Sequence, residues 1–168
     1  MIKSTLPRNE HYTGLYTVKQ NIAYCETGQD PNQTLDLIIP WEVQLSDEMH
    51  RTFPLIVFVQ GSGWQVGDNG FELVQLAELA KQGYIVAMVR HRNAFEGNPF
   101  PAYLTDVKTA IRFLRAHAEE YAIDKEHVIG LGTSSGGNAI QLIGLTADDP
   151  RYETADYAGY SDLAFQMS

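Results

Sequence analysis

The chain has 168 residues, of which 44% are hydrophobic and 20% charged, and its formal net charge is −9. This length predicts one domain with a sizeable core, and the negative charge disfavours nucleic acid as a partner because the chain would repel a phosphate backbone. No apolar run could span a bilayer, the N-terminus lacks the apolar core of a secretory signal, and a single cysteine excludes an internal disulfide. We therefore expect a cytoplasmic protein that binds neither membrane nor nucleic acid and needs no metal or cofactor.

Two predicted strands open the chain. Residues 15–24 and 34–41 have strand composition and are separated by a turn-rich segment at 27–32, which predicts a hairpin. In the second strand apolar residues alternate around Asp36, and Pro40 follows. This pattern is typical of an antiparallel outer strand that ends at the proline.

Strands and helices then alternate along the chain. Strands are predicted at 54–60, 84–89 and 127–131, and helices at 71–82, 101–121 and 136–147. Such alternation predicts an α/β fold, a mostly parallel sheet with right-handed crossovers and flanking helices. The run at 54–60 is the most apolar and is expected to be central.

One serine occupies the turn between the last predicted strand and helix. The pattern Gly132-x-Ser134-x-Gly136 is typical of a nucleophile elbow, in which small neighbours leave room for a strained turn. Ser134 is therefore the candidate nucleophile. The alternative is a loop rich in glycine and serine that merely turns the chain.

A second loop follows the central strand, at 61–64. In α/β sheets the ligand site lies beyond the carboxyl ends of the strands, so this loop and Ser134 are expected to meet. The backbone N–H groups of Ser62, Gly63 and Ser135 would then form an oxyanion hole, supported by the helix dipole. An ordinary glycine-rich turn is the alternative.

Three segments together resemble a known superfamily. Gln60-Gly61-Ser62-Gly63-Trp64 resembles the His-Gly-Gly-Gly-Trp oxyanion loop of α/β-hydrolase esterases and lipases, with Gln60 and Ser62 as departures. Segments 89–114 and 132–139 are similar to the hormone-sensitive-lipase-like and bacterial feruloyl or acetylxylan esterase groups. The resemblance covers residues 34–168. It implies a serine carboxylic-ester hydrolase that acts on small, aryl or carbohydrate-linked acyl esters through an acyl-enzyme at Ser134.

The resemblance also predicts that part of the catalytic machinery lies elsewhere. In this superfamily the acid and the histidine of the triad follow the nucleophile, and no histidine follows Ser134. Residues 1–168 are therefore expected to form a single, C-terminally incomplete α/β-hydrolase domain that is inactive alone. The absent strands would leave 128–131 on an open sheet edge, which predicts self-association or completion by another polypeptide.

The histidines and late acids of this chain have other expected roles. Among the histidines, at positions 11, 50, 91, 117 and 127, His91 alone is expected at the rim that carries Ser134, as a hydrogen-bonded loop residue. A role for His91 as a surrogate base is the alternative. The late acids, at positions 148, 149, 156 and 162, are expected on a solvated face. Two alternatives remain at this stage: a peptidase of the same fold, and a non-catalytic half-domain or pseudoenzyme used for binding or assembly.

Overall fold

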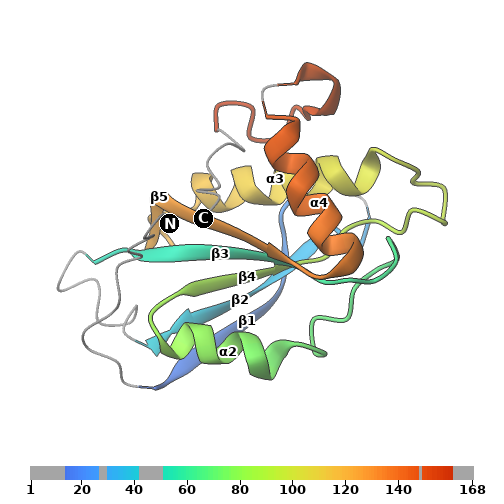
Figure 1. The fold of residues 1–168 in the computed structure, drawn as a ribbon. Helices are drawn as coiled ribbons and strands as arrows, with labels where there is room; N and C mark the ends of the chain where they lie inside the picture. Colours follow the sequence, from blue (N-terminus) through green and yellow to red (C-terminus); the bar gives the residue numbers. More distant parts are fainter. Residues whose placement is uncertain (1–13, 27–29, 42–50, 148, 161–168) are drawn as a thin grey trace, which may run out of the picture.

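A computed structural model of the chain describes residues 14–26, 30–41, 51–147 and 149–160. It contains a sheet with the strand order β1-β2-β4-β3-β5 (Figure 1). The elements in chain order are β1 (Tyr16–Ala23), β2 (Thr34–Pro40), β3 (Phe53–Val59), α2 (Leu73–Lys81), β4 (Ile85–Val89), α3 (Ala102–Ala116), β5 (Ile123–Gly132), α4 (Ser134–Leu145) and the short η2 (Pro150–Tyr152).

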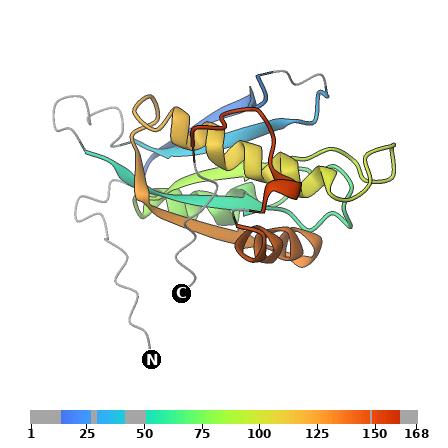
Figure 2. The same ribbon diagram turned by 90° about the horizontal axis from the view of Figure 1, so that it is seen from above.

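The sheet is sandwiched between helices. Helix α2 covers one face, and α3 and α4 cover the other (Figures 1 and 2). Strands β3, β4 and β5 are parallel to one another, whereas β2 is antiparallel to both β1 and β4. The predicted α/β class, with a mostly parallel sheet and flanking helices, is confirmed. Among the described helices, none has the length and apolarity that crossing a bilayer requires.

Strand β3 is buried on both faces because its apolar residues alternate between two cores. Leu55, Val57 and Val59 pack in the cluster beneath α3 and α4, and Ile56 and Phe58 pack against α2. Successive side chains of a strand point to opposite faces, so only a continuous apolar run can satisfy both layers. Complete burial of each such side chain contributes about 1.5–3 kcal/mol. The strand is interior, between β4 and β5, but the middle strand of the described sheet is β4 rather than β3 as predicted.

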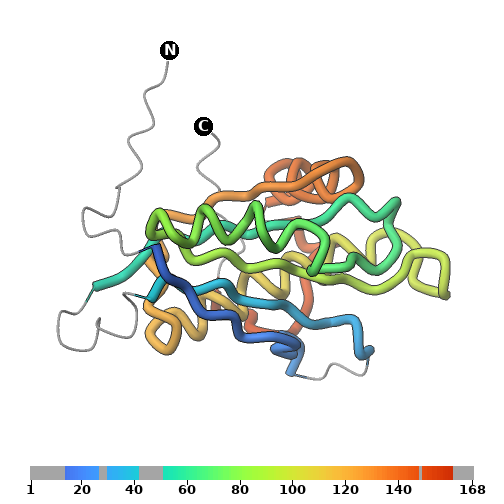
Figure 3. Tube along the Cα trace, turned by 90° about the horizontal axis from the view of Figure 1, so that it is seen from below, coloured from blue at the N-terminus to red at the C-terminus, as the bar shows by residue number. Residues whose placement is uncertain are grey.

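Strand β2 is not the outer strand that the alternation around Asp36 predicted. It lies between β1 and β4 (Figure 3), and Asp36 is only 3% exposed. The Asp36 carboxylate accepts hydrogen bonds from Arg90 Nη2 at 2.8 Å, from Asn69 Nδ2 at 3.0 Å and from the Asn21 N–H at 2.7 Å. A charge can be buried when it is paired and hydrogen-bonded in this way.

Strand β5 begins at Ile123, earlier than the predicted position 127. Its first residues pair with β3, and a register shift then carries the pairing from Asp124 to Val128. The sequence pattern missed this start because the polar residues of the irregularity interrupt the apolar run.

Helix α3 ends at Ala116, before the predicted position 121. The left-handed φ of 55° at Ala122 helps turn the chain into β5.

The segment after α4 lies beside α3 (Figure 2) and is tied to it by ion pairs. Lys108 on α3 is fully buried, and its ammonium group donates to the Thr146 carbonyl at 2.8 Å and to Glu153 at 3.1 Å. Glu153 also pairs with the buried Arg112, whose Nη2 donates to the Thr154 hydroxyl at 2.6 Å. One carboxylate therefore pairs with two buried cations and holds this segment on the helix.

Strand β5 forms one edge of the described sheet and pairs only with β3 there. Leu131 on this strand is 40% exposed. We therefore expect the 168-residue chain to self-associate at micromolar concentration, because an unpaired apolar strand edge recruits another strand. Leu131→Lys should shift the population toward monomer in size-exclusion chromatography with light scattering.

Leu145→Lys is the matched control for that prediction. Leu145 is 81% exposed but is the last residue of α4 and not part of the edge strand, so its substitution should leave the association unchanged. A monodisperse monomer of the unmodified chain would contradict an edge-driven association.

Candidate functional site

Ser134 stands at the turn between β5 and α4. β5 ends at Gly132, Thr133 is extended, and α4 begins at Ser134 rather than at the predicted Gly136. Ser134 has a left-handed φ of 48°, a conformation that costs a residue with a side chain about 1–2 kcal/mol. The residue is exposed at the positive end of the α4 dipole. The predicted strand, sharp turn and helix are confirmed.

The glycines on either side of Ser134 are required by crowding. A Cβ atom on Gly136 would lie 2.0 Å from the carbonyl oxygen of Val59, and one on Gly132 would lie 2.6 Å from the carbonyl carbon of Gly136. Side-chain atoms cannot approach a backbone so closely. The elbow therefore packs directly on the end of β3, and any larger residue at these positions would separate the two.

The loop after β3 lies against the elbow, as the sequence predicts. A Cβ atom on Gly61 would be 2.8 Å from Ser134 Cβ and 2.7 Å from the Thr133 carbonyl oxygen. At Gly63 the reason for glycine is different, because an added Cβ would meet nothing within 4 Å but φ is +61°. Trp64 follows with φ 63°, so two consecutive residues of this loop have left-handed φ angles.

Two hydrogen bonds join this loop to the elbow. The Gly61 N–H donates to Thr133 Oγ1 at 2.8 Å, and the Ser62 N–H donates to Ser135 Oγ at 3.0 Å. Both acceptors are side chains next to Ser134 in sequence. The Ser62 N–H, which the sequence suggests as an oxyanion donor, is thus directed at Ser135 Oγ, and its predicted catalytic role stays a prediction.

Gln60 has a structural role that the sequence did not reveal. Its Oε1 accepts a hydrogen bond from the Asp68 N–H at 2.5 Å, and its Nε2 donates to Glu72 Oε2 at 2.8 Å. A Cβ atom on Gly67 would lie 2.8 Å from the same Oε1. In the sequence Gln60 is only a departure from the histidine of related loops. Its amide closes the loop between β3 and α2.

Tyr103 on α3 links the loop to the nucleophile helix, and sequence reasoning missed it. The Tyr103 hydroxyl donates to Asn138 Oδ1 on α4 at 3.2 Å. Burial raises the pKa of Tyr103, while a hydrogen bond with the Trp64 side chain opposes the rise. The sequence signal that could have indicated this role is the position of Tyr103 in the first turn of the predicted helix, at the sheet edge where Ser134 was expected.

His91 is buried, and its hydrogen bond ties it to the backbone beside it. It is 3% exposed, its Nδ1 lies 2.9 Å from the Arg92 carbonyl oxygen, and its ring packs on Tyr103 at 5.8 Å between centroids. His117 contacts the carbonyl of its own helix, and His127 pairs with Asp124 at 2.7 Å. Within residues 51–147, no histidine is hydrogen-bonded to Ser134. The histidines at 11 and 50 lie outside the described residues.

The late acids divide between two environments. Asp149 is hydrogen-bonded by Arg151, which lowers the pKa of its carboxyl group to about 2. Asp156 lines a cavity rather than the expected solvated face. The acids at 148 and 162 lie outside the described residues. Asp149 pairs with Arg151 rather than with a histidine.

Comparison with known proteins agrees with this geometry. A family model, BD-FAE, matches residues 41–166 and spans the loop, the elbow and the helix after it. The chain belongs to the BD-FAE family of α/β-hydrolase esterases. The resemblance expected from the sequence is thereby confirmed.

Relatives of this BD-FAE chain include proteins named as esterases. Esterase LipC of Mycobacterium tuberculosis is 32% identical over 139 residues, which are 82% of this chain and 32% of LipC. A bifunctional GH43-CE structure from Bacteroides eggerthii is similar with a TM-score of 0.72 and 27% identity, over 86% of this chain and 21% of that one. Tannin acyl hydrolase from Lactobacillus plantarum shares the fold, with a TM-score of 0.77 at 22% identity, over 89% of this chain and 38% of that one. The chain therefore spans about a third of LipC and less than half of either structure.

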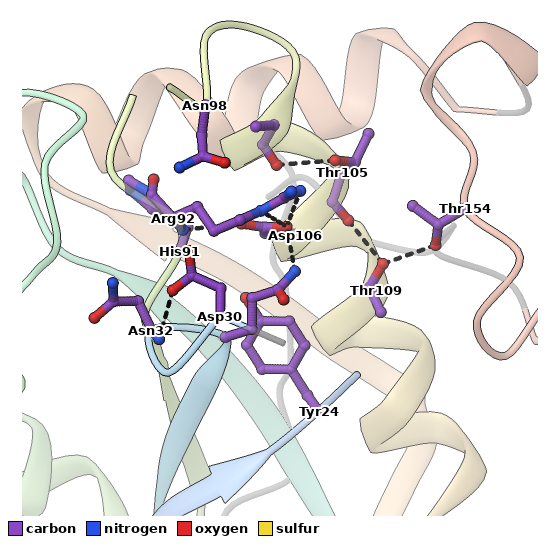
Figure 4. A network of polar contacts seen from close by, with 12 residues as sticks. Tyr24, Asp30, Asn32, His91, Arg92, Asn98, Thr105, Asp106, Thr109 and Thr154 are labelled. Atoms are coloured by element: carbon purple, nitrogen blue, oxygen red, sulfur yellow. Dashed lines mark hydrogen bonds and ion pairs between the residues drawn. The ribbon is translucent and has the colours of Figure 1, made fainter. Parts of the chain in front are cut away.

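A polar network joins the loop after β4 to α3 (Figure 4). The buried Asp106 carboxylate accepts hydrogen bonds from Arg92 Nη2 at 2.7 Å, from the Arg92 N–H at 2.9 Å and from Gln33 Nε2 at 2.9 Å. Arg92 belongs to the loop that follows β4. The pair therefore anchors that loop, together with the neighbouring His91, to α3.

A cavity of about 610 Å³ opens beside this network. Its lining contains three carboxylates and one guanidinium. The lining residues are Cys25, Asp30, Pro31, Gln33, Arg92, Asn98, Asp106, Thr109, Thr154, Ala155 and Asp156. Ser134 is not among them, so the cavity is separate from the elbow. Within the described part of the chain, no group of three His, Cys, Asp or Glu residues could hold a metal ion.

The crowding at Gly136 generates a stability prediction. Gly136→Ala should reduce the free energy of unfolding by more than about 4 kcal/mol, or prevent folding, because its Cβ would overlap the Val59 carbonyl. Gly63→Ala, where space is open but φ is +61°, should cost only about 1–2 kcal/mol. Urea denaturation followed by circular dichroism measures both, and equal losses would contradict the packing argument.

The thiol of Cys25 generates a pH prediction. Burial and the nearby carboxylates of Asp106 and Asp156 raise the pKa of Cys25 to about 12. The folded chain should therefore react with iodoacetamide at pH 8 about a hundredfold more slowly than free cysteine, and the rate should rise through pH 11. Because this is the only cysteine, mass spectrometry of the intact chain measures it directly.

The urea-unfolded chain is the control for Cys25, and it should react like free cysteine at the same pH. A folded-state rate that levels off near pH 9 would show that the thiol is not shielded, contrary to this expectation.

Proposed function

We propose that this chain forms the nucleophile-bearing part of a serine carboxylic-ester hydrolase, with Ser134 as the nucleophile. The observation that carries the proposal is the exposed Ser134 at φ 48°, at the start of α4, with the Gly61 loop packed against it. Membership of an esterase family and the similarity to Esterase LipC support the same reaction class.

The proposed reaction begins with attack of Ser134 Oγ on the carbonyl carbon of an ester, while a general base takes the hydroxyl proton. The tetrahedral oxyanion would be held by the N–H groups of Gly63 and Ser135. Ser135 stands in the first turn of α4, where backbone N–H groups lack helical acceptors. Collapse expels the alcohol and leaves an acyl-enzyme, which water hydrolyses. Each donor is worth about 10²–10³-fold in rate.

The acid and base of the reaction would come from outside these 168 residues. No histidine follows Ser134 in the sequence, and His91 is buried with its Nδ1 on a backbone carbonyl. The chain covers only 32% of Esterase LipC, which leaves most of such a protein to supply them. Without the base, turnover by this chain alone would fall by about 10⁶-fold.

We infer that the substrates are small, aryl or carbohydrate-linked acyl esters. Two exposed aromatic residues belong to the oxyanion loop and to the segment bonded to it. Trp64 ends the loop and is 39% exposed, and its carbonyl accepts a hydrogen bond from the Ala94 N–H. Phe95, the residue after Ala94, is 74% exposed. Planar acyl groups stack favourably on such rings. A solved structure of a carbohydrate esterase from gut microbiota, 29% identical to this chain, supports the same substrate class. No membrane or nucleic acid enters this proposal.

A non-catalytic role in binding or assembly is the second candidate. It is favoured by one observation, that no described histidine is hydrogen-bonded to Ser134. In that case the open edge of β5 would be the functional surface, and a second copy or another polypeptide would pair with it.

Covalent labelling separates the two candidates. The complete protein that carries this chain should form a fluorophosphonate adduct on Ser134, because the reagent needs an activated serine and an oxyanion hole. Peptide mass spectrometry should locate the adduct, and Ser134→Ala should abolish it while Ser62→Ala retains it. Labelling that persists in Ser134→Ala, or no labelling of the unmodified protein, would end the esterase proposal.

A further inference from the structure

The side chains on either side of Ser134 hold the loop that faces it. Thr133 Oγ1 accepts a hydrogen bond from the Gly61 N–H at 2.8 Å, and Ser135 Oγ accepts one from the Ser62 N–H at 3.0 Å. Both distances fall within the range of well-formed hydrogen bonds. Two consecutive loop amides are therefore bound by the two residues that bracket Ser134.

The elbow conformation explains why these hydroxyls can reach the loop. Thr133 is extended and Ser135 is helical, while the strained Ser134 between them reverses the chain. Ser135 is only 5% exposed, so its hydroxyl needs a partner, and a lost one would cost about 1–3 kcal/mol. The close approach of Gly61 to the elbow leaves the loop amides within range.

We propose that Thr133 and Ser135 are positioning residues, whose hydroxyls clamp the loop so that the Gly63 N–H faces the carbonyl oxygen attacked at Ser134. This inference rests on the proposed esterase function. The Ser62 N–H contributes by fixing the loop, since it donates to Ser135 Oγ, and the oxyanion is held by the N–H groups of Gly63 and Ser135.

A clamp matters because oxyanion stabilisation depends on fixed donors. Gly63 is exposed and has a left-handed φ of +61°, a conformation that glycine adopts easily but does not enforce. The anchors at Gly61 and Ser62 immediately precede it and therefore limit its freedom. A donor misplaced by about 1 Å can cost about 10²-fold in rate.

The first test measures the clamp itself, in the 168-residue chain. Amide hydrogen exchange of Gly61 and Ser62, followed by NMR, should be slow in the unmodified chain. Thr133→Val removes one acceptor and should accelerate exchange at Gly61 at least tenfold, and Ser135→Ala should do the same at Ser62. Thr133→Ser keeps the hydroxyl and should restore protection. Unchanged exchange in both variants would overturn the proposal.

The second test measures catalysis in the complete protein, with 4-nitrophenyl acetate as the substrate. Thr133→Val and Ser135→Ala should each lower kcat about tenfold to a hundredfold, with little change in KM, and Thr133→Ser should recover most of the loss. Thr105→Val is the matched control, because the Thr105 hydroxyl bonds within α3 and its loss should leave kcat unchanged. Should Thr133→Val not fold, Thr133→Ala makes the same comparison.

The outcomes separate this proposal from the esterase proposal. A rise in kcat for Ser135→Ala would mean that the freed Ser62 N–H is itself an oxyanion donor, which overturns the clamp but keeps the esterase. Unchanged kcat in both Thr133→Val and Ser135→Ala would also overturn the clamp and keep the esterase proposal. Absence of both hydrolysis and Ser134 labelling in the unmodified protein would overturn the esterase and the clamp together.

Discussion

The arrangement of the site depends on one close approach, that of helix α4 to the end of strand β3. Gly136 permits it, because any Cβ there would overlap the Val59 carbonyl. This contact sets the height of Ser134 above the sheet and brings the loop after β3 into range of the elbow. The hydrogen bonds at Gly61 and Ser62 follow from it. If α4 moved away from the end of β3, Ser134 and the loop after β3 would both lose their positions.

Much of this architecture could be predicted from local patterns in the sequence. The alternating burial of β3 follows from an unbroken apolar run, and the sharp turn at Ser134 follows from glycines spaced on either side of it. The meeting of the 61–64 loop with the elbow follows from the rule that parallel strands end at one edge. These inferences succeed because each depends on neighbours in sequence or on a general property of sheets.

The rest depends on partners distant in sequence, which a local pattern does not reveal. Asp36 suggested an outer strand because its partner Arg90 lies 54 residues further along the chain. Gln60 read as a departure from a family motif, although its amide joins two ends of a loop. The Ser62 N–H donates to Ser135 Oγ, which lies 73 residues further along the chain. Polar side chains were thus the main source of error, because the free energy of burying one depends on whether it finds a hydrogen-bond partner.

The pairing of Glu153 with Lys108 and Arg112 has a consequence for folding cooperativity. Both cations lie on α3 within the core, and burying them before their counter-charge arrives would be strongly unfavourable. The helix can therefore complete its docking on the sheet only when the segment beyond α4 docks as well. Two stretches more than 40 residues apart in sequence are thereby expected to become ordered in a single step, with the elbow between them enclosed in the same cooperative unit.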